Sequence, residues 1–480
     1  MASRGRNRPR MTLVGENAVT ADQDPSRAQR AKPFSGYHHR PARQEEPWLT
    51  QVGPGTPGGE YLRRFWHPFM IASELKDTPK GVRLLGEDLV LFRDQGGRLG
   101  LLHRHCIHRG TSLEFGIPAA RGIRCCYHGW LFDVDGTILE TPAEPETSRI
   151  RANFCQGAYQ LREYHGLIFA YMGAPEATPE FPIYDTFEHP AGNKLVPLKL
   201  ELPCNWVQVS ENASDPIHNA FLHVIVSGAQ FSPTFAIMPA LEFVESPLGY
   251  ICSATRRVKD HVFIRASDMI MPNVAQFIGG TQMVGEKEEF AIAAFLTRWA
   301  TPVDDHNSLY IGFTGFNAVT NPDGRLREEV IGVGKLNLIG QTADRPYAER
   351  QREPGDYDAI SSQGAIANRQ AEHLGTTDRG IVMFRRLLAR GIKEVEEGKT
   401  PSLPRLYADG SVRTYCHTAI MRVPEGSGIG VGELTALGEF GKRAAQIVIA
   451  TDTLAPKERE IEAERRIRPL LSQELAGAAE

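Results

Sequence analysis

Four residues of types that bind metal alternate within a short stretch of this chain. Cys106 and His108 form a first pair, and Cys125 and His128 form a second pair downstream. Two facing loops that each donate one thiolate and one imidazole can hold a [2Fe-2S] cluster, with both thiolates on one iron and both imidazoles on the other. The spacing therefore predicts that these four residues bind a mixed-ligand [2Fe-2S] cofactor.

A structural zinc site is the alternative for the same ligands. Zinc sites usually group their cysteines and their histidines, whereas here the two types are interleaved. Gly110 and Gly129 follow the two histidines, and glycine lets backbone N–H groups approach the cluster sulfurs. Cys126 breaks the gap between Cys125 and His128 and is interpreted as a bystander. The pattern favours a Rieske cluster, in which histidine replaces cysteine on one iron.

A second group of candidate ligands lies in the segment from Glu211 to His223. Two histidines and a carboxylate with open positions form the iron site of non-haem oxygenases, and His218 and His223 can supply the imidazoles. At this spacing they would point about 140° apart on an ideal helix. They converge only where the helix bends or begins, and Pro216 gives a reason for such a break. Asp215, one helical turn before His218, is expected to orient its ring.

The third iron ligand must come from another part of the chain. Asp378 is the leading candidate, because a helical pattern begins there and the start of a helix is a well-fixed place for a ligand. The alternative is that Asp378 only caps that helix. The competing carboxylates are Glu372, Asp356 and Asp358, and spacing alone does not choose among them.

With these motifs, the chain resembles the oxygenase α subunits of Rieske non-haem iron oxygenases. The narrower resemblance is to the branch with phthalate 4,5-dioxygenase, phenoxybenzoate dioxygenase and O-demethylases of aromatic acids. Matching landmarks run from about residue 49 to about residue 395. They include the Tyr-His-Gly-Trp sequence at 127–130, Glu211-Asn-x-x-Asp215 and the segment 362–380. The chain departs in its N-terminal extension and at Cys126, and neither is a ligand position.

The resemblance implies a complete metal site and a role for the Glu211 segment. Asp378 would join His218 and His223 as the third ligand of a mononuclear Fe(II). Asp215 and Asn212 would be the catalytic residues of the motif. Asp215 would bridge a cluster histidine of a neighbouring subunit and His218 of its own chain.

The resemblance also implies a homotrimer. Within one subunit the two metal centres would be too far apart for fast electron transfer, whereas across the subunit boundary the cluster of one chain faces the mononuclear iron of the next. The implied reaction uses O2 and externally supplied electrons to hydroxylate or O-demethylate an aromatic substrate, and a carboxylated one is expected.

The sequence offers no way to draw electrons from NAD(P)H directly. No Gly-x-Gly-x-x-Gly fingerprint follows a strand, and no plant-type cysteine motif for a further cluster occurs. A separate NAD(P)H-dependent reductase is therefore expected, with a ferredoxin as an optional partner. Arg256, Arg257, Arg265 and Arg298 are candidates to pair a substrate carboxylate, although surface or interface pairing is the more common role for any one of them.

Composition excludes several classes of protein. The formal net charge of −4 argues against nucleic acid or an anionic membrane as a partner. No apolar stretch approaches the ~18 residues of a membrane span. Seven cysteines without a disulfide-like arrangement indicate a reducing, cytoplasmic setting.

The predicted fold class is α+β, with four segments along the chain. Residues 1–46 are expected to form a disordered or draped arm, and 47–175 an all-β Rieske domain. An antiparallel sheet flanked by helices is predicted for the catalytic domain, 176–440. A charged helical tail, 441–480, is expected to be solvated, with cover over a neighbouring subunit as the alternative. Two other functions stay open: a Rieske electron carrier without oxygenase chemistry, and an oxygenase with a non-aromatic substrate.

Overall fold

The computed structural model describes residues 31–39, 46–226, 231–279, 288–321, 344–423 and 432–476. The chain divides into two compact units, and the smaller one consists of Met1–Gln44 together with Asn368–Glu372. Its short helix Ser35–His38 has no buried residue. Most of the predicted arm, residues 1–46, lies outside the described residues. The larger unit, Glu45–Ala367 with His373–Glu480, carries the sheets and helices described below.

The first part of the larger unit is an antiparallel β structure. Thr56 caps the helix α3 (Pro57–Leu62), because its Oγ1 accepts a hydrogen bond from the N–H of Gly59 at 3.2 Å. The described strands then form a six-stranded sheet in the order β1 (Trp66–Ile71), β10 (Leu167–Tyr171), β9 (Ala158–Tyr164), β4 (Leu99–His103), β3 (Glu87–Arg93) and β2 (Lys80–Leu84).

A second, smaller sheet supports the loops with the predicted cluster ligands. Its described strands are β5 (Ile117–Pro118), β6 (Ile123–Arg124), β7 (Leu131–Phe132) and β8 (Ile138–Glu140). Phe92 and Leu102 of the large sheet and Ile123 and Phe132 of the small one belong to one buried apolar cluster. This packing fixes the small sheet against the large one, since buried side chains interdigitate with few voids.

The second part of the larger unit contains a nine-stranded antiparallel sheet among the described residues. Its main path follows the order β11 (Lys194–Leu202), β18 (Ser308–Phe316), β17 (Leu296–Pro302), β15 (Val274–Phe277), β14 (His261–Ile270), β13 (Gly249–Val258) and β12 (Ala240–Ser246). β19 (His417–Arg422) pairs with β14 and with β16 (Glu289–Ile292).

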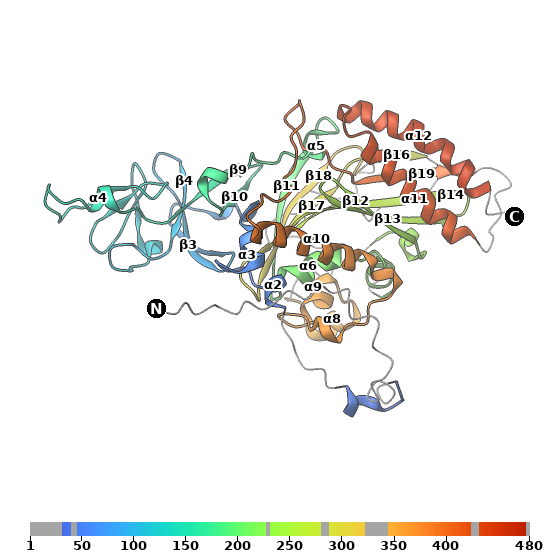
Figure 1. The fold of residues 1–480 in the computed structure, drawn as a ribbon, viewed down its shortest axis with the longest axis horizontal. Helices are drawn as coiled ribbons and strands as arrows, with labels where there is room; N and C mark the ends of the chain where they lie inside the picture. Colours follow the sequence, from blue (N-terminus) through green and yellow to red (C-terminus); the bar gives the residue numbers. More distant parts are fainter. Residues whose placement is uncertain are drawn as a thin grey trace, which may run out of the picture. The chain divides into compact units, whose positions relative to one another are not determined.

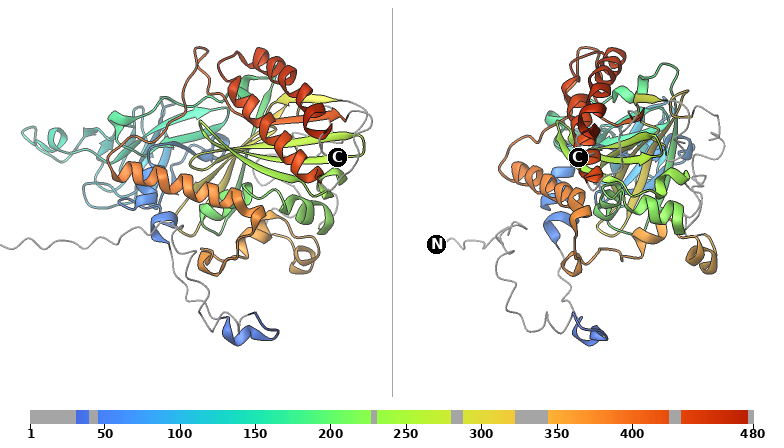
Figure 2. Two further views of the ribbon diagram at one scale, coloured as in Figure 1. Left: turned by 45° about the vertical axis from the view of Figure 1, so that its right-hand side comes forward. Right: turned by 90° about the vertical axis from the view of Figure 1, so that its right-hand side faces the viewer.

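Both faces of this sheet are covered by helices. Ile251, Val262 and Ile264 point to one face and pack with α11 (Glu433–Ala450) and α12 (Pro456–Ala476). Figures 1 and 2 show these two helices side by side over the strands. The other face, where Tyr250 and Cys252 lie by strand alternation, carries α6 (Trp206–Ala213) and α10 (Arg379–Glu396). Tyr250 Oη and Ser214 Oγ, just after α6, are 2.5 Å apart.

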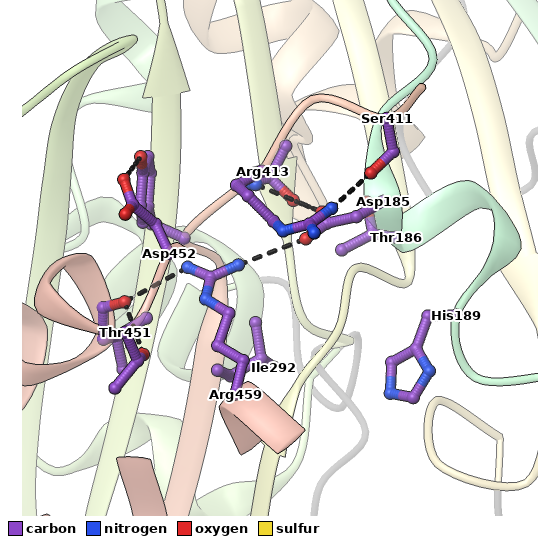
Figure 3. A network of polar contacts seen from close by, with 12 residues as sticks. Asp185, Thr186, His189, Ile292, Ser411, Arg413, Thr451, Asp452 and Arg459 are labelled. Carbon is purple, nitrogen blue, oxygen red and sulfur yellow. Dashed lines mark hydrogen bonds and ion pairs between the residues drawn. The ribbon is translucent and has the colours of Figure 1, made fainter. Parts of the chain in front are cut away.

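The C-terminal tail differs from the prediction of a solvated helix. The predicted boundary at 440/441 falls inside α11, and α12 buries Ala463, Ile467 and Leu471 in the core. Figure 3 shows how α12 is anchored: Arg459 Nη1 lies 3.1 Å from Asp185 Oδ2, and both side chains are almost fully buried. The many charges of α12 favoured the prediction of a solvated helix, but a helix with exposed charges can still bury one narrow apolar stripe in the core.

The predicted fold class is confirmed. The described chain is α+β, with an N-terminal β region followed by an antiparallel sheet between helices. None of the described helices is long and apolar enough to cross a membrane.

Candidate metal centres and active site

The four predicted cluster ligands lie on two facing loops. Cys106 and His108 follow β4, and Cys125 and His128 lie between β6 and β7. Both cysteines are about 3% exposed, and the ring centroids of the two histidines are 4.6 Å apart. The structure thus brings two buried thiols and two adjacent imidazoles to one end of the β region. This donor set fits a [2Fe-2S] cluster with two ligands on each iron.

Each loop is braced by a polar side chain. The amide of Gln156, which is buried, donates to the carbonyls of His103 and His105 and accepts the N–H of Ile107. Arg124 donates to the carbonyl of Gly129 at 2.6 Å. These contacts hold the backbone on either side of the ligands, which preorganises the site.

Turn geometry explains the glycines after the histidines. Gly110 and Gly129 have φ of 77° and 74°, in the left-handed region that glycine adopts without strain. Their N–H groups return to the carbonyls of Cys106 and Cys125, at 2.8 and 3.1 Å. Burial raises the pKa of Cys106 to about 11, so this thiol needs a strong positive charge nearby to ionise. A cluster iron supplies such a charge.

The second pair of histidines converges because the helix changes type between them. His218 begins the single turn α7 (His218–Ala220), which continues into a π-helix, Phe221–Val226. A π-helical turn closes i→i+5 hydrogen bonds and holds more residues than an α-turn. The two rings, five positions apart, therefore come to 5.2 Å between centroids. The break predicted near Pro216 is present, since α6 ends at Ala213.

The carboxylate that meets these rings is Asp356. One Oδ1 atom lies 3.3 Å from Nε2 of His223 and 3.6 Å from Nε2 of His218. Ligand atoms of the three residues all lie within 4.8 Å of one another. Asn212 Nδ2 donates to the same Oδ1 at 3.1 Å, so the predicted catalytic Asn212 orients the carboxylate. Two imidazoles and one carboxylate in this arrangement fit a ferrous ion with open positions.

This geometry replaces Asp378, the third ligand expected from the sequence, with Asp356. Asp378 Oδ2 accepts the N–H of Gly375 at 2.6 Å, which caps the turn before α10. This differs in detail from the alternative that Asp378 caps the helix, because its side chain makes no capping hydrogen bond to α10 and instead closes the preceding turn. Asp378 does not join the group of His218, His223 and Asp356.

Helix capping also explains which aspartate of α9 (Asp356–Ser361) faces the histidines. Asp358 accepts the N–H of Gly355 at 3.1 Å and is held by Arg345 and Arg350 at 3.0 and 2.5 Å. Asp358 thus fixes the start of α9 and leaves Asp356 to face the site. In both Gly355-x-x-Asp358 and Gly375-x-x-Asp378, the aspartate accepts the N–H of the glycine three residues before it. This repeated pattern could have marked Asp358 and Asp378 in the sequence as carboxylates that cap a turn.

The electrostatics of the site favour an ionised Asp356. Burial raises the pKa of this carboxyl, but the charge and hydrogen bond of His223, the charge of His218 and the Asn212 amide together hold it well below its usual range. An ionised carboxylate between two imidazoles is the state that a divalent cation requires.

Asp215 lies beside Nδ1 of His218, whereas Asp356 lies beside Nε2 of the same ring. Asp215 Oδ2 is 3.7 Å from Nδ1 of His218, and Asp215 Oδ1 accepts the N–H of Ile217 at 2.9 Å. Burial raises the pKa of Asp215, but the hydrogen bond and charge of His218 with the neighbouring backbone N–H groups lower it further. The side chain stays 31% exposed, so this carboxylate is within reach of another molecule.

Three of the four candidate arginines do not lie at the surface, contrary to the more common role expected for them. Arg256, Arg265 and Arg298 are at least 93% buried. Arg257 does make an ion pair, with Glu433 at 3.2 Å.

The chain is similar to a known domain family and to known oxygenase subunits. The family model of the Rieske [2Fe-2S] domain matches residues 65–182. The tert-butanol monooxygenase / tert-amyl alcohol desaturase oxygenase subunit of Aquincola tertiaricarbonis is 45% identical, over 79% of this chain and 83% of that one. The phenoxybenzoate dioxygenase subunit alpha of Ectopseudomonas oleovorans is 38% identical, over 77% of this chain and 89% of that one.

The fold has solved counterparts as well. NdmB of Pseudomonas putida CBB5 superposes with a TM-score of 0.53 at 21% identity, covering 73% of this chain and 95% of that one. The domain and the site thus define a protein with a Rieske cluster and a mononuclear metal centre. The chain belongs to the Rieske non-haem iron oxygenases and is the oxygenase subunit of such a system.

Proposed function

We propose that this oxygenase subunit hydroxylates or O-demethylates an aromatic compound at a ferrous ion held by His218, His223 and Asp356. The observation that carries the proposal is the convergence of these three side chains within 4.8 Å. A ferrous ion with open positions supplies the activation of O2. Phe231, stacked on the His223 ring at 4.4 Å, offers an aromatic surface beside the site.

The proposed cluster ligands are Cys106, His108, Cys125 and His128. The buried thiols and adjacent imidazoles support this assignment. We further propose that Asp215 accepts the Nδ1 proton of His218 and meets a cluster histidine of a neighbouring subunit in a homotrimer. The partly exposed Asp215 carboxylate, 3.7 Å from the His218 ring, supports this role.

The proposed partners are an NAD(P)H-dependent reductase and, where the system has one, a ferredoxin. The assignment as an oxygenase subunit supports a separate electron donor. The proposed setting is the cytoplasm, because Cys126 and Cys155 are exposed free thiols, which persist in a reducing compartment.

A second candidate substrate class is a small tertiary alcohol. It is favoured by the relative from Aquincola tertiaricarbonis, whose name gives tert-butanol and tert-amyl alcohol as its substrates. The choice between the two classes is a matter of what the side chains beside the iron site recognise.

The test is metal analysis followed by turnover. Anaerobically purified protein should hold about three iron and two sulfide per chain, and the reduced cluster should give a rhombic EPR signal of low average g. With a surrogate reductase, methoxylated and phenoxylated benzoates and tert-butanol are then offered. Two iron and two sulfide, unchanged on adding ferrous ion, would leave only an electron carrier, and zinc without sulfide would exclude both functions.

A further inference from the structure

Two buried arginines stand side by side on the sheet face that carries the metal site. Arg256 lies on β13 and Arg265 on β14, where Ala254 pairs with Arg265 and Arg256 with Phe263. Because strand side chains alternate, Arg256 and Arg265 point to the same face. They are 1% and 7% exposed. Two cations are therefore held together away from water.

Neither arginine has a carboxylate partner among the described residues. Arg256 donates to the carbonyls of Ile237 at 2.8 Å and Ala254 at 3.5 Å, and its Nη2 is buried with no partner in the described chain. Within the described part of the chain, Arg265 donates hydrogen bonds only to the carbonyl of Ile278, at 3.4 and 3.3 Å. Each guanidinium has five N–H donors, so the hydrogen-bonding capacity of both is largely unused.

Three other buried arginines are each paired with a carboxylate, whereas Arg298, which is also buried, donates to the carbonyl of Val209 at 3.2 Å and has no ion pair within the described residues. Arg63 lies 2.8 Å from Glu87, Arg413 lies 2.9 Å from Asp409, and Arg459 lies 3.1 Å from Asp185. A buried charge without an opposite charge is costly. Arg256 and Arg265 differ from Arg298 in that two cations lie together, and this points to an anion from outside the described chain that binds between them. In keeping with this, burial, together with the charge of Arg265, lowers the pKa of Arg256 to about 9.

Aromatic rings connect this pair to the metal site. The Phe235 ring lies 5.2 Å from Cζ of Arg256 and 5.5 Å from Cζ of Arg265. The Phe231 ring lies 6.0 Å from Cζ of Arg265 and stacks on His223. One aromatic ring thus separates a guanidinium from an imidazole of the metal site.

We propose that Arg256 and Arg265 form the anion-recognition site for the substrate, and that the enzyme acts on an aromatic carboxylate. The carboxylate binds between the two guanidinium groups, and the ring of the substrate extends past Phe231 toward His223. This inference rests on the proposed function. It decides a point that the two curated relatives leave open, since the name of one gives neutral alcohols and the name of the other an aromatic acid.

The experiment measures ligand binding to the holoenzyme by the shift in its melting temperature. The probes are benzoate, 4-methoxybenzoate and 3-phenoxybenzoate, each beside its neutral amide, and tert-butanol. We expect at least one acid to stabilise the wild type, with its amide and tert-butanol weaker by about tenfold or more. Equal binding of acids and amides, or no stabilisation by any acid, would overturn the proposal.

Variants assign the binding to the pair. Arg256→Gln and Arg265→Gln should each weaken the acid by about ten- to a hundredfold and leave the amide unchanged. Arg257→Gln is the matched control, because it changes the same charge on the same strand with its side chain on the opposite face. Unchanged acid affinity in both test variants contradicts the proposal. If neither variant folds, the comparison of acid with amide on the wild type still decides.

Turnover measured beside binding separates this inference from the proposed function. An acid that binds without O2 consumption or product would remove the oxygenase proposal and leave the anion site standing. Oxidation of the amides or of tert-butanol, with no binding of acids, would keep the oxygenase and remove the anion site.

Discussion

At the scale of single residues, the site depends on which carboxylates are free to bind. Asp358 and Asp378 both accept a backbone N–H at the start of a helical turn, so their charge is already used by the helix. Asp356 lies at the first position of α9, is oriented by Asn212, and faces both histidines. The role of an aspartate here follows from its position relative to the helix start.

Separate alanine substitutions of Asp356 and Asp378 test this assignment directly. Asp356→Ala should lose the mononuclear iron, retain the cluster with about two iron per chain, and give less than about one hundredth of the wild-type turnover. Asp378→Ala should keep about three iron and most of the activity, and lose about 1 kcal/mol of stability with its cap. Iron analysis and product formation are the measurements. Loss of iron in Asp378→Ala, with retention in Asp356→Ala, contradicts the assignment.

At the scale of elements, two irregular features place the functional parts. The π-helix Phe221–Val226 brings His218 and His223 together despite their spacing. The helix α12 packs through a narrow apolar stripe and one buried ion pair, Arg459 with Asp185. Thr414 completes this pair, because its N–H and hydroxyl both donate to Asp185 Oδ1, at 3.1 and 2.6 Å. The sheet under the site is thereby closed on its far face.

Removal of one partner of this buried pair should loosen the C-terminal helix. Arg459→Met leaves the Asp185 carboxylate buried without its cation, and we expect a loss of about 3–5 kcal/mol in the free energy of unfolding. Arg465→Met, on the same helix but exposed and paired with Glu462, should cost less than about 1 kcal/mol. Denaturant unfolding of both variants is the measurement. Similar losses in the two would mean that the pair contributes no more than a surface pair.

The stability of this region should also depend on pH through Asp268. Burial raises the pKa of Asp268 to about 7, against a bonded N–H of Tyr415 and the charge of Arg459, which lower it. The folded state therefore holds a proton that the unfolded chain releases near pH 4, so the contribution of Asp268 to stability is full below about pH 4 and is lost as the pH rises through about 7.

Asp268→Asn removes this titration. Between pH 5 and pH 8 the wild type should lose stability relative to the variant, measured by melting temperature across that range. A constant difference between the two proteins over this range would show that Asp268 does not titrate there.

At the scale of the whole molecule, one chain carries ligands for two metal centres, and the proposed homotrimer joins them across a subunit boundary. Asp215, partly exposed beside His218, is the residue through which such a boundary would act. The arrangement makes each subunit dependent on its neighbour, which a closed cyclic oligomer satisfies for every copy.

Mixed oligomers test this dependence. His108→Ala removes a cluster ligand and Asp356→Ala an iron ligand, so each variant alone should be inactive. Co-expressed in equal amounts, they should regain about one quarter of the wild-type activity, because half the chains supply iron and half of their neighbours supply a cluster. The control is the same two proteins purified separately and mixed without subunit exchange. Absence of activity in the co-expressed sample would mean that both centres must lie in one chain.

Local sequence determined the parts of this protein whose chemistry is local. Ligand type and spacing predict the cluster site at Cys106, His108, Cys125 and His128. The alternation of apolar residues predicts the strands, and the Thr-Pro sequence predicts the start of α3. The sequence identified His218 and His223 as a pair of ligands. It also showed that the helix between them must be irregular, but it did not predict that the irregularity is a π-helix. Each of these signals spans only a few residues, and over that length the spacing of the residues determines how their side chains can be placed.

Only the tertiary structure decided the rest. Asp356 lies more than a hundred residues from the histidines that it meets. The local Gly-x-x-Asp pattern can mark Asp358 and Asp378 as caps, but nothing local shows that Asp356 reaches the histidines. Arg256 and Arg265 look like surface charges in the sequence, and only the sheet buries them side by side. The physical reason is the same in both cases: a carboxylate or guanidinium can cap, pair or bind, and its role is set by the partners that folding brings within about 4 Å.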